Sequence, residues 1–134
     1  MRDAPAPELP GRRGPAPGEP PRFVLVAGET SGDNLGAGLI RALRARRPDA
    51  RFAGIAGPRM IAEGCEAWVP AERLAIMGLV EILKHLPELV RIRRELVART
   101  LAFAPHAYVG IDAPEFNLGV SARLHGRLRT VQYV

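Results

Sequence analysis

The sequence of 134 residues contains a single cysteine, Cys65, which excludes an internal disulfide and a thiol-rich zinc site. Aromatic residues make up only 5% of it, whereas proteins that bind single-stranded nucleic acid stack bases on aromatic side chains. No uninterrupted apolar run approaches the roughly 18 residues that a membrane-spanning helix needs. Its histidines, His85, His106 and His125, lack the spacing of metal ligands. These absences predict a cytoplasmic protein without metal, cofactor or nucleic acid.

The first 21 residues differ in composition from the rest. Residues 1–21 contain seven prolines and three glycines and lack the continuous apolar core of a secretion signal. This composition is typical of a disordered tail or of a wrongly assigned start. With 47% apolar residues, the chain is long enough for one compact domain and too short for two ordinary ones. We therefore expect a tail over residues 1–21 and one domain over residues 22–134.

The positive charge is concentrated in one segment. Residues 1–21 carry three basic and three acidic residues, so the formal net charge of +5 belongs to residues 22–134. Residues 84–99 hold five basic side chains, Lys84, Arg91, Arg93, Arg94 and Arg99, against Glu88 and Glu95. A basic surface of this kind can bind nucleic acid or an anionic membrane. The scarcity of aromatic residues favours the membrane.

Apolar runs bounded by turn residues alternate with helical patterns along the domain. Strands are expected over residues 23–27, 51–56, 67–69, 107–111 and 130–134, and helices over residues 34–46, 57–64, 76–85, 87–103 and 116–124. Pro87 is expected to separate the third helix from the fourth, with the break near Leu86. The alternation predicts an α/β, Rossmann-like fold in which helices cover both faces of a parallel sheet. Because no helix follows the last strand, we expect a truncated chain.

Asp112 stands where the apolar run over residues 107–111 gives way to a turn. Ligands of open α/β sheets bind at the carboxyl ends of strands, so this carboxylate can act there as a general base. It can also cap the next helix or stabilise the turn at Pro114. Glu115 and Asn117 are close enough in sequence to line the same pocket as substrate-binding residues, or to be solvated residues at the start of a helix.

Residues 28–33 form a second polar turn, which follows the strand expected over residues 23–27. The free backbone N–H groups at the start of the next helix attract anions, so a phosphate group can bind there. The pattern is not a Walker loop, which needs four residues between its glycines and then Lys-Ser or Lys-Thr. It is not a dinucleotide fingerprint either, because Gly36-Ala37-Gly38 falls inside the expected helix. Alternatively, the glycines only allow a tight turn and close packing, and Ser31 and Asp33 cap the helix. If the turn is functional, its substrate-binding residues are Gly28, Glu29, Ser31, Gly32 and Asp33.

Apolar residues recur at helical spacing from Leu79 to Val90, beside the basic segment. Such a stripe is usually core, as we expect Cys65 and Trp68 to be. The alternative is a face that enters a lipid interface, because the residues just before the stripe are apolar on more than one side. The residues of the stripe are Leu79, Ile82, Leu83, Leu86, Leu89 and Val90.

Four segments, taken together and in this order, resemble the N-terminal domain of the lipid-A-disaccharide synthase family. They are Ala-Gly-Glu-Thr-Ser-Gly-Asp at residues 27–33, Ala-Gly-Pro-Arg-Met at 56–60, Leu-Ala-Ile-Met-Gly-Leu-Val-Glu at 74–81 and Gly-Ile-Asp-Ala-Pro at 110–114. The resemblance covers residues 23–134. Four ordered segments are far more specific than any one of them.

The resemblance implies the N-terminal half of a two-domain GT-B glycosyltransferase. Such an enzyme joins UDP-2,3-diacylglucosamine to 2,3-diacylglucosamine 1-phosphate, forms a β-1,6-linked disaccharide and releases UDP. It works as a peripheral protein at the cytoplasmic face of the inner membrane. The resemblance also implies that this chain lacks the C-terminal nucleotide-binding domain and is inactive by itself.

By the same resemblance Asp112 is the general base, and residues 28–33 lie beside the cleft between the domains. The resemblance also implies that an apolar surface reaches toward the membrane through Val80, Ile82, Leu83, Leu86, Leu89 and Val90. Two positions depart from the family pattern: Glu115 stands where an Asp is usual, and His106 replaces an Asp before the strand. Two alternatives remain, a Rossmann-type module that binds a nucleotide or sugar phosphate without catalysis, and the inactive remnant of a broken gene.

Overall fold

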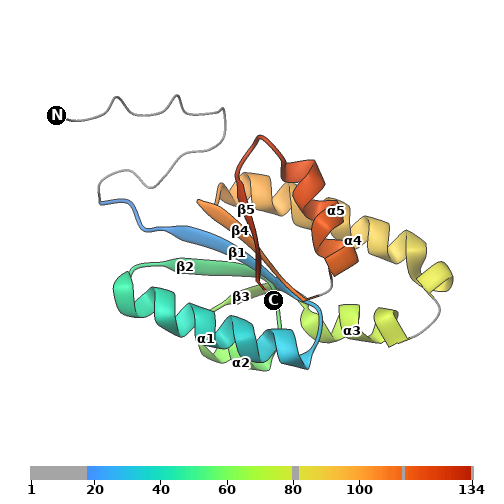
Figure 1. Ribbon diagram of the computed structural model, residues 1–134, viewed down its shortest axis with the longest axis horizontal. Helices are drawn as coiled ribbons and strands as arrows, with labels where there is room; N and C mark the ends of the chain where they lie inside the picture. The colour runs from blue at the N-terminus through green and yellow to red at the C-terminus, as the bar shows by residue number, and fades with distance from the viewer. Residues whose placement is uncertain (1–17, 80–81, 113, 134) are drawn as a thin grey trace.

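The computed structural model describes residues 18–79, 82–112 and 114–133. In this part of the chain strands and helices alternate around a single sheet (Figure 1). The elements in chain order are β1 (Arg22–Ala27), α1 (Thr30–Arg46), β2 (Arg51–Ala56), α2 (Pro58–Ala62), β3 (Glu66–Pro70), α3 (Ala71–Leu79), α4 (Ile82–Phe103), β4 (Ala107–Ile111), α5 (Pro114–Leu124) and β5 (Arg129–Tyr133).

The five strands pair in parallel in the order β3-β2-β1-β4-β5. The chain builds outward from β1 through β2 to β3, and then returns to place β4 on the other side of β1. The direction of winding therefore reverses between β1 and β4, whose last residues, Ala27 and Ile111, are paired in register. This arrangement confirms the predicted α/β, Rossmann-like class.

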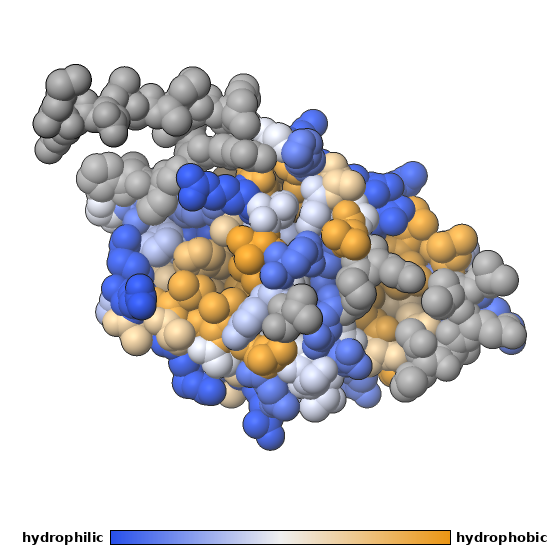
Figure 2. Space-filling model, in the orientation of Figure 1, coloured by the Kyte–Doolittle hydropathy of each residue, from blue (hydrophilic) through white to orange (hydrophobic). Residues whose placement is uncertain are grey.

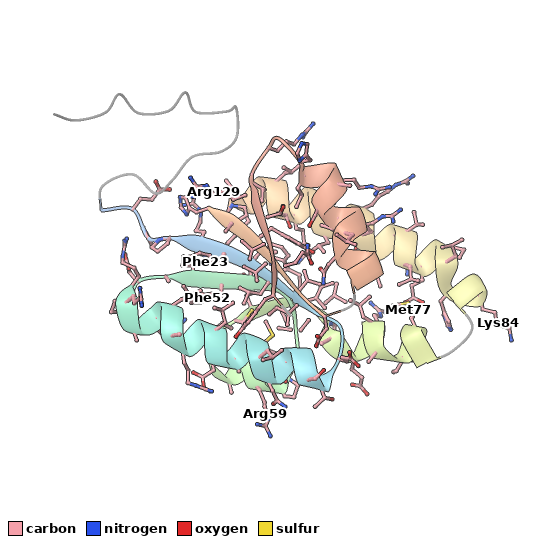
Figure 3. The ribbon with its side chains drawn as sticks, in the orientation of Figure 1. Phe23, Phe52, Arg59, Met77, Lys84 and Arg129 are labelled. Atoms are coloured by element: carbon pink, nitrogen blue, oxygen red, sulfur yellow. The ribbon has the colours of Figure 1, made fainter. Side chains whose placement is uncertain are left out.

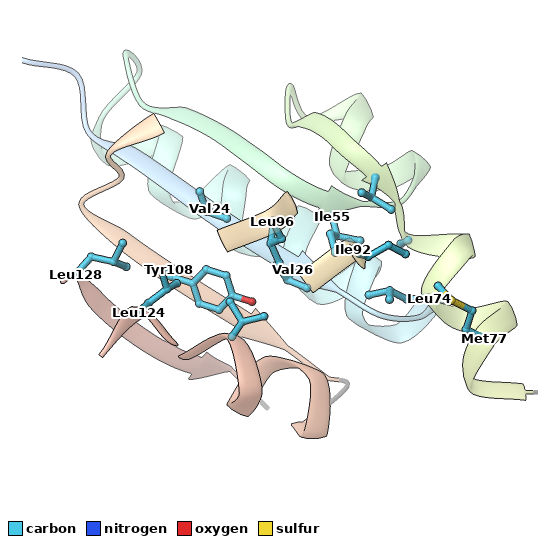
Figure 4. Packing of buried hydrophobic residues seen from close by; sticks show 13 residues of the cluster. Val24, Val26, Ile55, Leu74, Met77, Ile92, Leu96, Tyr108, Leu124 and Leu128 are labelled. Carbon is cyan, nitrogen blue, oxygen red and sulfur yellow. The ribbon is translucent and has the colours of Figure 1, made fainter. Parts of the chain in front are cut away.

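Helices cover both faces of the sheet, as predicted. In β1, Val24 and Val26 point to one side and Leu25 and Ala27 to the other, the alternation expected of a strand buried on both faces. On the first side α3, α4 and α5 contribute the buried residues Leu74, Met77, Ile92, Leu96, Val120 and Leu124 (Figure 4). On the second side α1 and α2 contribute Ala37, Ile40 and Met60.

The first helix begins earlier than the sequence predicted. The expected helix started at residue 34, whereas α1 starts at Thr30. Glu29 is extended, and the Asp33 N–H donates to the Glu29 carbonyl at 2.9 Å, which closes the first helical turn. Gly32 lowers helix propensity, but it lies in a buried position against β1. Tertiary packing thus extends the helix through a glycine-containing segment.

The predicted helix break near Leu86 is wrong. The helix α4 runs from Ile82 to Phe103 with Pro87 inside it, and α3 starts at Ala71 rather than at residue 76. Pro87 lies in the second turn of α4, so its missing N–H removes one backbone hydrogen bond close to the amino end of the helix. Further along, the buried residues Ile92 and Leu96 anchor the helix on the sheet.

The remaining boundaries agree with the expected ones to within a few residues, and β2 and β4 match them at both ends. Most of the expected tail and the last residue of the expected final strand lie outside the described residues. The described end of the tail contacts the domain, because the Arg51 N–H donates to the Pro21 carbonyl at 2.8 Å and Glu19 pairs with Arg22.

Candidate active site

The structure brings the two polar turns together at one point of the sheet edge. Gly28 follows β1 and Asp112 follows β4, and these two strands are neighbours. Figure 1 shows their carboxyl ends converging near the start of α1. The Ser31 hydroxyl donates a hydrogen bond of 3.0 Å to Asp112 Oδ2, across 81 positions of the sequence. The candidate site therefore lies where the strand order reverses, the usual ligand position in open α/β sheets.

Asp112 is partly exposed and keeps hydrogen-bonding capacity. Its Oδ2 accepts from Ser31, which is exposed, whereas Oδ1 has no partner among the residues that the structure describes. Within those residues the carboxylate also receives no hydrogen bond from α5, so the structure gives no support to the helix-capping alternative. An ionised carboxylate with a free acceptor oxygen can take a proton from a bound hydroxyl group.

Gly32 leaves the space that the Asp112 carboxylate occupies. A Cβ atom at Gly32 would stand 2.9 Å from Asp112 Oδ2 and 3.3 Å from Ala27 Cβ. Any larger residue would therefore displace the carboxylate or the helix. Of the other predicted residues in this turn, Gly28 is buried and Glu29 is exposed.

Asp33 has a structural role at the start of α2. Its carboxylate is 3% exposed and accepts hydrogen bonds from the backbone N–H groups of Arg59 (3.0 Å) and Met60 (2.9 Å). It thereby caps α2, whose start is marked by Arg59 in Figure 3. The N-cap residue of α2, Gly57, has no side chain to do so, and that lack was the sequence signal for a cap from elsewhere.

Asn117 is fully buried and supports Asp112 from behind. Its Nδ2 donates to the Asp112 backbone carbonyl at 2.6 Å, and its Oδ1 accepts from the Tyr108 hydroxyl at 2.7 Å. Both ends of the Asn117 amide are therefore engaged inside the domain. Tyr108 was not among the predicted site residues; its hydroxyl in an otherwise apolar strand was the available signal. The Glu115 side chain lies outside the described part of the structure.

The predicted membrane-contact residues differ in their surroundings. Leu86 is 48% exposed, whereas Leu89 packs against the core and Val90 is half-buried. Ile76 on α3, at 51% exposure, adds an apolar side chain that was not in the predicted set. The side chains of Val80, Ile82 and Leu83 lie outside the described residues. The stripe is therefore partly core and partly surface, and Figure 2 shows apolar surface over the α3–α4 end of the molecule.

The basic segment contributes exposed charge next to this surface. Arg91 and Arg94 are exposed on α4, and Lys84 projects from the beginning of that helix (Figure 3). Nearby, Arg73 lies 3.5 Å from Glu88, and the Arg99 guanidinium lies over the Trp68 ring. No helix in the described ranges combines the length and the apolar character needed to cross a membrane.

The remaining candidates for chemistry are accounted for by packing. Cys65 is 4% exposed, and burial raises the pKa of its thiol to about 12, which keeps it protonated and unreactive. Trp68 packs edge-to-face against Phe103, with ring centroids 5.7 Å apart. Across the described segments, no group of three or more His, Cys, Asp or Glu side chains is arranged to hold a metal ion.

Fold and site together define a Rossmann-like α/β domain that presents a carboxylate at the reversal point of its sheet. Residues 23–134 match the family model of Lipid-A-disaccharide synthetase, and the chain belongs to this family. The family resemblance of the four sequence segments is thereby confirmed.

Several lipid-A-disaccharide synthases are similar to this chain over most of its length. The protein of Serratia proteamaculans (strain 568) is 60% identical over 111 residues, which cover 82% of this chain and 29% of that protein. The protein of Yersinia pseudotuberculosis serotype I (strain IP32953) is 57% identical over 118 residues, with 87% and 30% covered. That of Haemophilus influenzae (strain PittEE) is 57% identical over 115 residues, with 85% and 30% covered. The chain thus spans about 30% of the length of these curated relatives.

Proposed function

We propose that this chain forms the acceptor-side part of a lipid-A-disaccharide synthase. The reaction joins UDP-2,3-diacylglucosamine to 2,3-diacylglucosamine 1-phosphate, forming a β-1,6-linked disaccharide and releasing UDP. Membership of the family supports the reaction class. The observation that carries the assignment of this segment is the Asp112 carboxylate, partly exposed, with one free acceptor oxygen, beside the turn that follows β1.

In the proposed mechanism Asp112 is the general base. A sugar hydroxyl of the acceptor attacks the anomeric carbon of the donor, the new C–O bond forms with inversion, and the bond from that carbon to the diphosphate breaks. The hydroxyl proton passes to Asp112 Oδ1, while the Ser31 hydroxyl holds Oδ2 in place. The departing UDP carries the negative charge away, and its stabilisation falls to residues outside this segment, in a C-terminal nucleotide-binding domain. We therefore propose that the segment is inactive by itself.

The test is Asp112→Asn in a full-length synthase that carries residues 23–134, completed where necessary by the matching remainder of the Serratia relative. The amide preserves shape and can still accept from Ser31, but it cannot take a proton. We expect kcat to fall more than tenfold, about 1.4 kcal/mol or more in the activation barrier, with thermal unfolding unchanged.

The matched control is Asp49→Asn, since Asp49 is an exposed carboxylate paired with Arg47. This variant should keep full activity. Retention of more than about a tenth of the activity by Asp112→Asn would contradict the base role. Calorimetric binding of UDP or of a sugar phosphate to the wild-type protein, without any turnover, would favour instead a module that binds nucleotide or sugar phosphate without catalysis.

We further propose peripheral binding at the cytoplasmic face of the inner membrane through the surface at the junction of α3 and α4. Among the described residues, exposed Ile76 and Leu86 support this proposal, together with exposed Arg91 and Arg94 on the same helix pair. Apolar side chains flanked by basic ones are the combination that binds an anionic lipid interface.

A further inference from the structure

We propose that Tyr108 and Asn117 are positioning residues that set the direction of the Asp112 carboxylate. They act through the Asp112 backbone and do not touch the substrate. This inference rests on the proposed role of Asp112 as the base, and it adds two buried residues, from β4 and from α5, to the machinery of the site.

Asp112 needs such support because of its backbone conformation. Its φ angle is +55°, in the left-handed region that residues with a side chain adopt rarely. A change of φ to a negative value would turn the Cα–Cβ bond in another direction and move the carboxylate away from Ser31. The conformation therefore persists only if neighbouring groups hold it.

Asn117 provides that hold, and chemistry fixes the orientation of its amide. The Asp112 carbonyl can only accept a hydrogen bond, so the group facing it at 2.6 Å must be the Asn117 NH2. The Asn117 Oδ1 then faces Tyr108, whose hydroxyl must donate at 2.7 Å. The chain of donors runs in one direction, from the phenol through the amide to the Asp112 carbonyl.

Burial protects this chain of hydrogen bonds from solvent. Tyr108 and Asn117 are both fully buried, so water does not compete for their polar atoms. Burial also raises the pKa of Tyr108, which keeps the phenol protonated and available as a donor throughout the working pH range. Loss of either group would leave a buried polar atom without a partner.

Gly110 explains how Asn117 reaches its place. Tyr108 and Gly110 lie on the same face of β4, two positions apart, and α5 packs over that face. A Cβ atom at Gly110 would stand 2.7 Å from Asn117 Cγ and 2.8 Å from Asn117 Cβ. Only glycine leaves room for the amide beneath the helix. Gly32 likewise leaves room for the Asp112 carboxylate, because a Cβ atom there would stand 2.9 Å from Oδ2.

The first variant that tests the inference is Tyr108→Phe, which deletes one hydroxyl and keeps the ring that packs in the core. In the full-length synthase carrying this segment we expect kcat to fall about tenfold, because the base is misdirected, while KM stays within about twofold. In the Asp112→Asn background the same substitution should cause no further loss of kcat, because it acts through Asp112.

Gly110→Ala serves as the second variant, since its methyl group would crowd Asn117, and Gln132 Oε1 at the same distance of 2.7 Å, without deleting any hydrogen-bonding group. It should show the same fall in kcat and the same dependence on Asp112. The control is Ser121→Ala, which removes the hydrogen bond between Gln132 and Ser121 on α5 without touching Asp112; its kcat should be unchanged.

The outcomes separate the two proposals. Unchanged kcat in both Tyr108→Phe and Gly110→Ala overturns the positioning role, as does an equal loss in the Asp112→Asn background, which would indicate a general effect on folding. Full activity of Asp112→Asn by itself overturns the base role and with it the proposed function.

Discussion

Two aspartates at the same edge of the sheet have opposite surroundings. Both carboxylate oxygens of Asp33 accept hydrogen bonds from backbone N–H groups at the start of α2, and the residue is 3% exposed. Asp112 is partly exposed, and its carboxylate accepts one hydrogen bond, from the Ser31 hydroxyl. The first carboxylate is satisfied and structural, whereas the second retains capacity for a ligand. Residue type is the same in the two cases, so the role is decided by what the neighbours donate.

Thr100 on α4 has a buried hydroxyl group without a hydrogen-bond partner among the described residues. The residue is 0% exposed, and its Oγ1 has no hydrogen-bond partner in the part of the chain that is described. Thr100→Val replaces this hydroxyl by a methyl group of the same shape. We expect the free energy of unfolding to rise by about 1 kcal/mol, measured by chemical denaturation. The exposed Thr130→Val is the control, and a loss of stability in Thr100→Val would show that the hydroxyl has a partner in solution.

At the scale of elements, the amino ends of β1 and β4 are tied together by a reciprocal contact. The backbone N–H of Arg22 donates to His106 Nδ1 at 2.9 Å, and the backbone N–H of His106 donates to the Arg22 carbonyl at 2.7 Å. The Arg22 guanidinium also donates to the carbonyls of Phe103 and Ala104 at the end of α4. His106 is therefore part of the junction between α4, β1 and β4.

This junction predicts a pH dependence of stability. Burial, and next the positive charge of Arg22, lower the pKa of His106 from 6.5. The neutral imidazole accepts the hydrogen bond from Arg22 through Nδ1. A pKa lowered in the folded state means that the contribution is complete above about pH 6.5 and is lost as the pH falls below it.

The measurement is the free energy of unfolding between pH 8 and pH 5 for the wild type and for His106→Asn, a variant without this titration. We expect the difference between them to shrink as the pH falls below about 6.5, and only modestly, since the ring is partly exposed. A constant difference across this range would contradict the assignment.

At the scale of the whole molecule, charge and apolar surface occur together at the α3–α4 end. The formal net charge of +5 belongs to residues 22–134, and its exposed members on α4 include Arg91 and Arg94. Exposed Ile76 and Leu86 lie on the same pair of helices. An anionic lipid surface would gain from both contacts at once.

The test is the combined variant Ile76→Ser with Leu86→Ser, compared with the wild type in sedimentation with vesicles containing about 30% anionic lipid. We expect vesicle binding to fall several-fold while the thermal transition is retained, because both side chains are about half exposed. The control is Leu118→Ser on α5, which changes a side chain of 59% exposure and should leave binding unaltered. Collapse of the thermal transition instead would show that Ile76 and Leu86 belong to the core.

Local pattern was sufficient for much of the fold. The alternation of apolar runs and helical segments predicted every strand, the parallel sheet with helices on both faces, and the position of Asp112 at a strand end. These features depend on periodicity and on general rules of chain winding, which act over a few residues or on the order of elements. The same rules misplaced the start of α1 and the break at Pro87, where packing against the sheet outweighs local propensity.

The roles of particular side chains were decided only by tertiary structure. Asp33 accepts from the backbone N–H of Arg59, 26 positions further along the chain, and Ser31 meets Asp112 across 81 positions. Nothing in the spacing of Tyr108 and Asn117 shows that a phenol and an amide would meet behind Asp112. A hydrogen bond requires two groups at about 3 Å in suitable directions, and folding alone creates that proximity for residues far apart in sequence.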